Sequence, residues 1–433
     1  MRRSFKLVWL AIAVTGLALG LAACGDDDDG GGGGGEETLD LTIGDSLPLT
    51  GGLSDFGPPG EKAAGIAEDE INKAIEEAGV DHSITIVSED NGGGDDQQAA
   101  VSSVEKIVAD GASCVAGAWA SADTIPISES VAIPDEVVLI SPASTSDEIT
   151  ALDDPDGFIN RTVPPDSFQG PTLANYIDQE LGGAEGKVVN VGARNDAYGT
   201  GLVDTFTEAW EGLGGTTNEP VIYDPELPNY DSEAEQLVEG DPDATVIFDF
   251  PETYNKVGPA LVRAGFDPTT TFFTDGLASS DLPSTAGEEA TEGMRGTAPG
   301  APDEGEASTA FDTLYVDSEP KDIDRQTFDA QNFDAIVLCY LAAVAAGSTD
   351  GQDMAEVVRD ISGAPGDQYT WEELPEAIEA LQNGDDIDYE GASGSIEMDE
   401  AGDATAGVYD TLTFKGGKIE TVGEVPVATD TEE

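Results

Sequence analysis

Apolar and polar residues along this chain follow two alternating periods. From residue 38 onward, short apolar runs typical of buried strands alternate with longer stretches in which apolar residues recur every three or four positions. The first series predicts strands over 41–46, 84–89, 113–117 and 137–141, with helices around 63–78, 95–109 and 123–132. Strands that alternate with helices predict a doubly wound sheet with helices on both faces.

A second series of the same kind follows. It predicts strands over 187–192, 220–223, 244–250 and 271–274, and helices over 169–181, 199–213, 232–239 and 252–264. After Met294 the pattern becomes mainly helical, clearest over 328–346 and 374–382. Beyond Gly391 it becomes strand-like, with a hairpin turn at 415–418. The chain is therefore predicted to be an α/β protein of two doubly wound lobes joined by several crossovers, as in a hinged clamp.

Residues 137–146, Val-Val-Leu-Ile-Ser-Pro-Ala-Ser-Thr-Ser, are the most informative single stretch. The apolar run stops abruptly in small hydroxyl residues, and Pro142 ends the strand because it has no N–H to donate. In open parallel sheets, ligands bind just beyond the carboxyl ends of the strands. The hydroxyls and free N–H groups of this stretch therefore predict one wall of a binding site.

The N-terminus has the pattern of an export signal. Arg2, Arg3 and Lys6 form a basic segment, residues 7–21 are apolar, and Leu-Ala-Ala-Cys ends at Cys24. The last four residues resemble the lipobox of bacterial lipoproteins, in which the cysteine is lipidated and becomes the new N-terminus. We expect residues 1–23 to be a signal peptide and lipidated Cys24 to anchor the protein to the outer face of the cell membrane. An uncleaved anchor is the alternative, although the apolar stretch is short for a hydrocarbon core of ~30 Å.

Residues 24–37 contain aspartates, a glycine run and two glutamates, without an apolar residue after Cys24. Such a segment cannot bury enough surface to offset the entropy of ordering, so it is predicted to be a flexible tether. The whole chain has a net charge of −72. This charge excludes nucleic-acid binding, which needs clustered basic residues, and its self-repulsion favours a marine or otherwise salt-adapted source.

Three cysteines and one histidine limit the available chemistry. With Cys24 lipidated, Cys114 in a predicted strand and Cys339 on an apolar predicted helix are expected to be buried free thiols. A disulfide between them is the alternative that export permits. The single histidine, His82, leaves no histidine or Cys/His metal site, and no metal or cofactor is predicted.

Two local motifs suggest other chemistry. The tetrapeptide Gly-Asp-Ser-Leu, which contains Ser46, is the signature of GDSL-type esterases, whose serine nucleophile needs a histidine base. That family places the base in a C-terminal Asp-x-x-His motif, which is absent here, and His82 lies close behind the serine instead. Residues 386–397 have nearly the carboxylate spacing of a calcium-binding loop, but a strand is predicted after them. Neither activity is favoured.

Small, hydroxyl and aromatic residues recur at the predicted strand ends of both series. Those concerned are Phe56, Ser121, Ser144 and Thr145 in the first series and Tyr198, Phe250 and Asp275 in the second. Their recurrence at the carboxyl ends of strands in both lobes predicts one ligand site between the lobes.

With these residues in view, the chain resembles the type I periplasmic solute-binding proteins of the branched-chain amino acid (leucine/isoleucine/valine) family. The resemblance runs from about residue 41 to residue 414. The matching segments, in order, are 49–51, 56–57, 140–145, 161–162, 169–171, 196–201, 292–294 and 391–403. Their order and spacing together carry the resemblance, because no single motif is specific.

The resemblance implies a two-lobed clamp that closes on a small ligand and delivers it to the permease of an ABC transporter. Ser121 and Thr145 stand where family members bind the α-carboxylate of an amino acid, with backbone groups of Ser144 beside them. Asp275 stands where an acidic residue pairs with the α-ammonium, and the three aromatic residues named above align with the walls. Asp275 is shorter than the frequent glutamate, and Trp119 beside Ser121 narrows the side-chain pocket.

The lobes implied are residues 38–162 plus 296–390 and residues 163–295 plus 391–433. We therefore predict a monomeric, lipid-anchored, extracytoplasmic substrate-binding protein for an amino acid or a similar small polar ligand, without enzymatic activity or cofactor. Two alternatives stay open: a secreted GDSL-type esterase that uses Ser46, and a ligand-sensing receptor on the same fold.

The acidic composition gives a first testable prediction. Because salt screens the repulsion among carboxylates, the thermal midpoint of unfolding should rise from low to molar salt. Thermal melts in a salt series measure it, and an unchanged or falling midpoint would contradict salt adaptation.

Overall fold

The computed structural model of this chain describes residues 38–302 and 305–428. The predicted signal peptide, Cys24 and the tether lie outside the described residues. Within the described residues, no helix combines the length and the apolar character that a membrane span requires.

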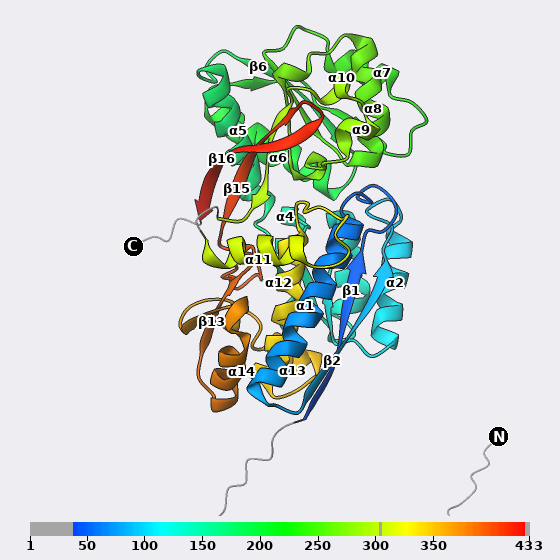
Figure 1. Ribbon diagram of the computed structural model, residues 1–433. Helices are drawn as coiled ribbons and strands as arrows, with labels where there is room; N and C mark the ends of the chain where they lie inside the picture. The colour runs from blue at the N-terminus through cyan, green and yellow to red at the C-terminus, as the bar shows by residue number, and fades with distance from the viewer. Residues whose placement is uncertain (1–37, 303–304, 429–433) are drawn as a thin grey trace, which may run out of the picture. The chain divides into compact units, whose positions relative to one another are not determined.

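Five parallel strands form the first sheet, in the order β2-β1-β3-β4-β5. Their bounds are β1 (Leu39–Leu47), β2 (His82–Asp90), β3 (Cys114–Ala116), β4 (Val138–Ser141) and β5 (Ile159–Arg161). The helices of this first lobe are α1 (Gly57–Ala78), α2 (Gln97–Ala109), α3 (Ser121–Ile127), α4 (Asp147–Thr150), α11 (Glu306–Asp317), α12 (Asp329–Ala346), α13 (Gly351–Ala355) and α14 (Leu374–Asn383). Figure 1 shows α1 and α12 beside β1, with α2 on its other side.

Local sequence explains where these elements begin and end. Two prolines stand near the start of α1, where the missing N–H groups cost nothing. The helix ends at Gly79, which has a φ of 71° and donates its N–H to the carbonyl of Ile75. A left-handed residue at this position favours glycine because a side chain would clash with the backbone. The strand β4 is buried throughout, as expected for a strand covered on both faces.

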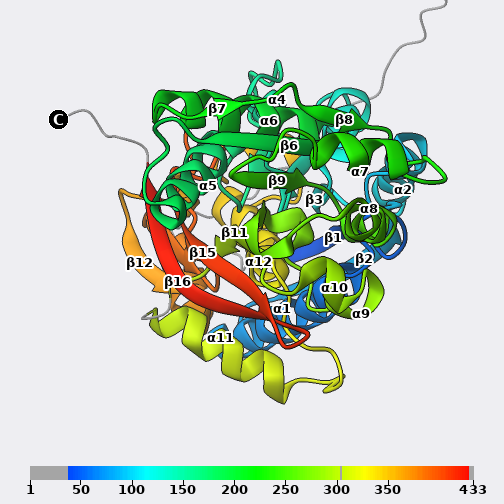
Figure 2. The ribbon, with the colours of Figure 1, turned by 90° about the horizontal axis from the view of Figure 1, so that it is seen from above.

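The second sheet has eight strands, in the order β16-β15-β11-β10-β9-β6-β7, with β8 also paired to β6. Their bounds are β6 (Val188–Arg194), β7 (Thr216–Thr217), β8 (Val221–Tyr223), β9 (Ala244–Phe248), β10 (Thr271–Phe273), β11 (Arg295–Gly300), β15 (Ala406–Lys415) and β16 (Lys418–Ala428). The helices of this second lobe are α5 (Asp166–Leu181), α6 (Ala197–Gly212), α7 (Asp231–Leu237), α8 (Pro251–Ala264), α9 (Leu282–Thr285) and α10 (Glu288–Thr291). Strands β6 to β11 are parallel to one another, whereas β15 is antiparallel to both of its neighbours, β11 and β16. In Figure 2 helices lie on both sides of this sheet.

The chain passes between the two sheets after β5, after β11 and after a small third sheet. That sheet consists of β12 (Asp367–Thr370), β13 (Ile387–Gly391) and β14 (Gly394–Ser395), and β13 packs into the core of the first lobe. Because β11 pairs with β10 in the second sheet, the second passage follows Gly300. The lobe limits given from the sequence, including the boundary before residue 296, stay a prediction.

The α/β fold predicted from periodicity is confirmed, and both series of strands and helices are present with bounds shifted by a few residues. The region after Met294 was expected to be mainly helical, but it starts with β11. The sequence of β11, Arg-Gly-Thr-Ala-Pro-Gly, has no apolar run that would predict a strand. It forms a strand because it lies between β10 and β15 in the sheet, not because of its own propensity. Residues 386–391, part of the calcium-like spacing, lie in and next to β13.

The prediction of free thiols is wrong. Cys114 of β3 and Cys339 of α12 are joined by a disulfide, with their Cα atoms 5.7 Å apart. The two residues are separated by 225 positions, so the sequence alone does not reveal that α12 packs against β3. The bond links the strand that leads into Ser121 to the central helix of the first lobe.

This disulfide gives a second prediction. Its removal in Cys114→Ser/Cys339→Ser should lower the free energy of unfolding by about 2–5 kcal/mol, because the unfolded chain loses a long closed loop. Urea unfolding of the variant measures the change. Thiol alkylation under denaturing, non-reducing conditions provides the control, and modification of Cys114 and Cys339 in the exported protein would contradict the bond.

Candidate functional site

The loops at the carboxyl ends of the strands of both lobes touch each other. The Glu252 N–H at the start of α8 donates to the carbonyl of Gly52 in the β1–α1 loop, at 3.4 Å. The Ser279 hydroxyl, beyond β10, donates to the carboxylate of Asp55 at 2.5 Å. The seven predicted site residues all lie in these strand-end loops or in the first positions of the helices that follow them.

The wall from the first lobe is built by α3 and by the loop after β4. Ser121 begins α3, and its hydroxyl accepts a hydrogen bond from the Ser146 N–H at 3.1 Å. The Ser144 hydroxyl is bonded to Thr124 Oγ1 at 2.8 Å, so it braces the loop against α3. The Thr145 hydroxyl is buried and has no hydrogen-bond partner among the described residues. Thr145 lies close enough to Asp166 to lower the pKa of that carboxyl, so the two side chains belong to the same part of the site.

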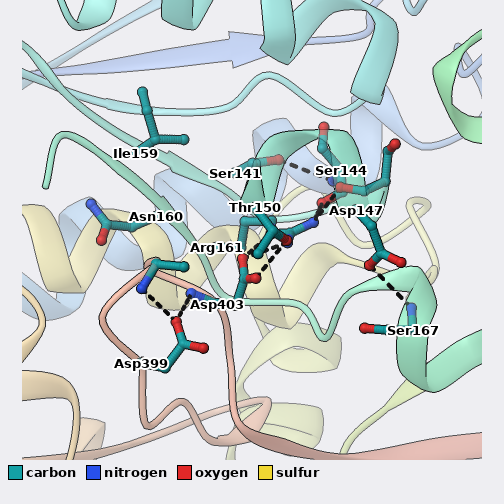
Figure 3. Close-up of polar contacts among 12 residues, drawn as sticks. Ser141, Ser144, Asp147, Thr150, Ile159, Asn160, Arg161, Ser167, Asp399 and Asp403 are labelled. Carbon is teal, nitrogen blue, oxygen red and sulfur yellow. Dashed lines mark hydrogen bonds and ion pairs between the residues drawn. The ribbon is translucent and has the colours of Figure 1, made fainter. Parts of the chain in front are cut away.

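A buried guanidinium holds this loop from behind. Arg161, at the end of β5, donates from Nη1 to the carbonyls of Ser144 and Ser146, at 3.2 and 3.0 Å. It also donates from Nη2 to Thr150 Oγ1 at 2.7 Å and from Nε to Asp403 Oδ1 at 2.8 Å (Figure 3). Both partners of this ion pair are largely buried. Each charge needs the other, because a buried charge without a partner is strongly destabilising. The arrangement fixes the backbone on which Thr145 stands.

The wall from the second lobe centres on Asp275. Tyr198, on the first turn of α6, donates its hydroxyl to Asp275 Oδ1 at 2.9 Å and accepts from the Gly276 N–H at 3.0 Å. A Cβ atom at Gly276 would lie 2.5 Å from the carbonyl oxygen of Asp249, so glycine is needed for this approach. Burial raises the pKa of Asp275 to about 6, and the Tyr198 hydrogen bond opposes that rise.

Aromatic rings flank the polar groups. The rings of Tyr198 and Phe250 are 5.0 Å apart. From the first lobe, Phe56 and Trp119 each pack edge-on against Phe328, with ring centroids 6.0 and 6.1 Å apart. All five rings belong to one hydrophobic cluster, which contains residues of both lobes.

Asp166 is a candidate residue that the sequence analysis missed. It begins α5, its N–H donates to the Thr145 carbonyl at 2.7 Å, and its carboxylate is buried with no hydrogen-bond partner among the described residues. Burial, and then the negative charge of Asp275, raise the pKa of Asp166 well above its usual range. Asp166 also follows a strand end, but β5 has only three residues and was not recognised in the sequence.

Further oxygens near these carboxylates are also buried without a partner among the described residues. They are Thr145 Oγ1, both carboxylate oxygens of Asp166, Gln169 Oε1, Thr297 Oγ1 and the Tyr409 hydroxyl. The charges of Asp275 and Asp166 contribute, after burial, to raising the pKa of Tyr409, which places the three residues in one electrostatic environment. Buried polar groups are normally hydrogen-bonded, so these carboxylate, amide and hydroxyl oxygens mark a site suited to a ligand that both donates and accepts hydrogen bonds.

The esterase hypothesis finds no support in the geometry. Ser46 is buried at the carboxyl end of β1, and its hydroxyl accepts from Asn91 Nδ2 at 3.3 Å. His82 pairs in register with Leu39 at the opposite end of the same strand, about 23 Å away at roughly 3.3 Å per residue. Nδ1 of His82 is hydrogen-bonded to the Tyr340 hydroxyl at 2.9 Å. The only histidine of the chain cannot act as a base for Ser46.

Comparison with known proteins identifies the family. The sequence profile described as "Periplasmic binding protein" matches residues 40–418. The chain belongs to the periplasmic binding protein family. The Leu/Ile/Val-binding protein homolog 3 of Brucella melitensis is 28% identical over 383 residues, which cover 88% of this chain and 93% of the relative.

A second relative of this periplasmic binding protein is the chemotactic signal transduction system substrate-binding protein BasB of Halobacterium salinarum. It is 25% identical over 393 residues, which cover 88% of both chains. Among solved structures, the leucine binding protein LivK of Thermotoga maritima has a TM-score of 0.73 at 23% identity, with 89% of this chain and 98% of that chain covered. These likenesses confirm the predicted family and the type I periplasmic binding protein fold.

The unpaired carboxylate gives a third prediction. Folding raises the pKa of this carboxyl group, so the folded protein holds a proton that the unfolded chain has already lost. The free energy of unfolding therefore decreases as pH rises above the pKa of the unfolded chain. Asp166→Asn should therefore increase the free energy of unfolding of the ligand-free protein by about 1–2 kcal/mol at pH 8. Urea unfolding at pH 8 and pH 5 measures it. A gain that is equally large at both pH values, or no gain, would contradict an ionisable, unpaired Asp166.

Proposed function

We propose that this periplasmic binding protein captures an amino acid, as a zwitterion, between its two lobes and delivers it to the permease subunits of an ABC importer. The observation that carries the proposal is a buried cluster that combines two hydroxyls of the first-lobe wall, Ser121 and Thr145, with two carboxylates: Asp275 after β10, and Asp166, whose N–H donates to the Thr145 carbonyl. Capture needs no chemistry, only closure of the lobes.

The α-carboxylate would bind to the first-lobe wall. The Thr145 hydroxyl, which also acts on Asp166, and the Ser121 hydroxyl, which only accepts from the Ser146 N–H, would donate to the α-carboxylate. Ser144 supports this wall rather than completing it, since its side chain is bonded to Thr124, its N–H donates to Ser141 Oγ at 3.0 Å and its carbonyl accepts from Arg161. Arg161 keeps this backbone in place from behind.

The α-ammonium would bind between Asp275 and Asp166. A buried ammonium without a charge partner costs several kcal/mol, and two carboxylates buried near each other repel. An ammonium between them would gain a charge partner and reduce that repulsion. The extra carboxylate also answers the concern that Asp275 is shorter than the glutamate frequent in the family. Tyr198 and Phe250 would flank the ligand, with Phe56 on the opposite side.

Export and anchoring complete the proposal. The N-terminal pattern that ends in Cys24 supports a lipoprotein on the outer face of the cell membrane. The Brucella relative, named for leucine, isoleucine and valine, supports an amino acid as ligand. The net charge of −72 supports a salt-adapted source.

A sensor is the second candidate function. The name of the Halobacterium relative, a substrate-binding protein of a chemotactic system, favours it specifically. Both functions use the same clamp, so the site does not distinguish them. Neighbouring genes for a permease and an ATPase would favour transport, and a neighbouring transducer gene would favour sensing.

The fourth prediction tests the ligand class. In thermal-shift assays at molar salt, at least one L-amino acid should stabilise the protein, by about 2.7 kcal/mol at 100 times its dissociation constant. Amides, urea and aromatic acids should not. Asp275→Asn and Asp166→Asn should each weaken binding at least tenfold, whereas the matched control Asp231→Asn, at an exposed aspartate of the same lobe, should bind normally. Unchanged affinity in both site variants would contradict the ammonium assignment.

Binding of the same amino acid should depend on pH. The pKa of Asp275 is raised to about 6, so below that pH the carboxyl group takes up a proton and no longer balances the ammonium. Affinity should therefore fall as pH decreases below about 6, measured by isothermal titration calorimetry. Asp275→Asn should remove most of this acid-side fall.

A further inference from the structure

One guanidinium joins the two lobes outside the proposed ligand site. Arg194, at the end of β6 in the second lobe, is fully buried, and its guanidinium carbon lies 3.7 Å from the ring centroid of Phe250. It forms an ion pair with Asp196, the N-cap residue of α6. Its Nη2 also contacts Oδ1 of Asp95, a first-lobe residue before α2, at 3.3 Å. The same side chain therefore touches an aromatic wall of the site and the opposite lobe.

The surroundings of Arg194 contain more negative charge than one guanidinium can balance. Asp123 of α3, in the first lobe, is buried, accepts from the Gly94 N–H at 2.8 Å with one oxygen, and has no partner for the other among the described residues. Asp249, after β9 in the second lobe, is buried and accepts from the Tyr223 hydroxyl at 2.9 Å. Four carboxylates thus surround Arg194: those of Asp95, Asp123, Asp196 and Asp249. Their charges act on a guanidinium that still has one donor, Nη1, without a hydrogen-bond partner among the described residues.

The lobes pack closely at this point. Gly94 has a φ of +91°, and a Cβ atom there would lie 3.0 Å from Ala120 Cβ and 3.1 Å from Phe250 Cε2. The first-lobe loop that carries Asp95 therefore lies directly on the ring over which Arg194 is stacked. Any movement that separates the lobes must break the Asp95–Arg194 ion pair and expose Asp123.

We propose that Arg194 is a positioning residue that holds the two lobes together around the ligand, as a second-lobe cation that pairs with Asp95 of the first lobe and whose charge also acts on Asp123. This inference rests on the proposed function, because it assumes that the lobes separate and close during capture. Arg194 lies behind the Phe250 ring, and its Nη1 has no hydrogen-bond partner among the described residues. It supports the Phe250 wall from behind and ties that wall to the opposite lobe.

The excess of carboxylates makes this contact depend on pH. Burial, then the charge of Asp95, raises the pKa of Asp123 to about 7, while Arg194 lowers it and Asp196 raises it. Burial also raises the pKa of Asp249 to about 7, against the effect of Arg194 and the Tyr223 hydrogen bond. When the lobes separate, Asp123 meets water and loses its proton more readily. Closure therefore takes up protons, and it is favoured as pH falls toward 7 and below.

Arg194→Gln tests the contact, with Asp95→Asn as a milder change at a partly exposed partner. Arg263→Gln, which removes the exposed Arg263–Asp231 ion pair of the same lobe, is the matched control. An equimolar mixture of proteinogenic L-amino acids at millimolar concentration serves as the probe. We expect both site variants to release a bound amino acid about tenfold faster than the wild type in stopped-flow fluorescence, and the control to match the wild type.

Small-angle X-ray scattering separates closure from folding. With the amino-acid mixture, Asp95→Asn should keep a larger radius of gyration than the wild type, whereas its unfolding midpoint without ligand should change little, because Arg194 keeps its ion pair with Asp196. Equal release rates and equal radii in wild type and both site variants would overturn the proposal. Because removal of the buried Arg194 also leaves Asp196 without its partner, a loss of stability is expected in Arg194→Gln, and a normal release rate in Asp95→Asn would by itself overturn the proposal, since it indicates a purely structural role.

The pH profile supplies a readout that a structural role would not move. Amino-acid affinity of the wild type should decrease from about pH 6 to pH 8, and Asp123→Asn should flatten this decrease. An identical slope in Asp123→Asn would count against the shared cation.

If the wild type binds no amino acid at all, the proposed function fails. The contact is then tested by scattering without ligand, where only wild type and control should become more compact as pH falls from 8 to 6.

Discussion

The guanidinium of Arg161 is the interaction on which the first-lobe wall depends. It joins three parts of the chain that are distant in sequence: β5, the loop after β4, and the segment around Asp403 that leads back into β15. Because the donors of Arg161 are fixed in a plane, they set the positions of two loop carbonyls at once. The hydroxyl of Thr145 is thereby held in place by the backbone alone, without a hydrogen bond of its own.

Basic residues are scarce in this chain, and several of them serve at such internal joints. Arg161 ties the loop after β4 to the crossover, Arg194 lies between the lobes, and Arg359 of the first lobe donates to Asn160 Oδ1 and to the carbonyl of Glu400. A chain with 89 carboxylates can place acidic residues almost anywhere on its surface. Buried arginines such as Arg161 and Arg194 balance the charge of aspartates inside the protein. Their positions therefore indicate the joints between segments better than the positions of the aspartates do.

Periodicity in the sequence was sufficient for the fold, because long apolar runs and helical faces record local burial. It placed the seven predicted site residues at strand ends, where the structure has them. It failed at β11 and β5, which are strands because of their neighbours, and the failure at β5 concealed Asp166. It also failed for Cys114 and Cys339, whose proximity is a property of packing between distant segments. The role of Ser144 as a brace could not be foreseen, since a hydroxyl in a sequence has no direction.

The repeated crossings between the sheets have a consequence for how the molecule can be divided. Helix α12, which fills the core of the first lobe, comes after the entire β6–β11 series, and β15 of the second lobe comes after α14. Neither lobe is a continuous piece of chain. Fragments cut at a single boundary would leave both cores incomplete, and an exchange of one lobe between relatives would need three breakpoints rather than one. Three separate connections between the same two bodies also resist twisting, so that bending about a shared axis is the motion they leave open.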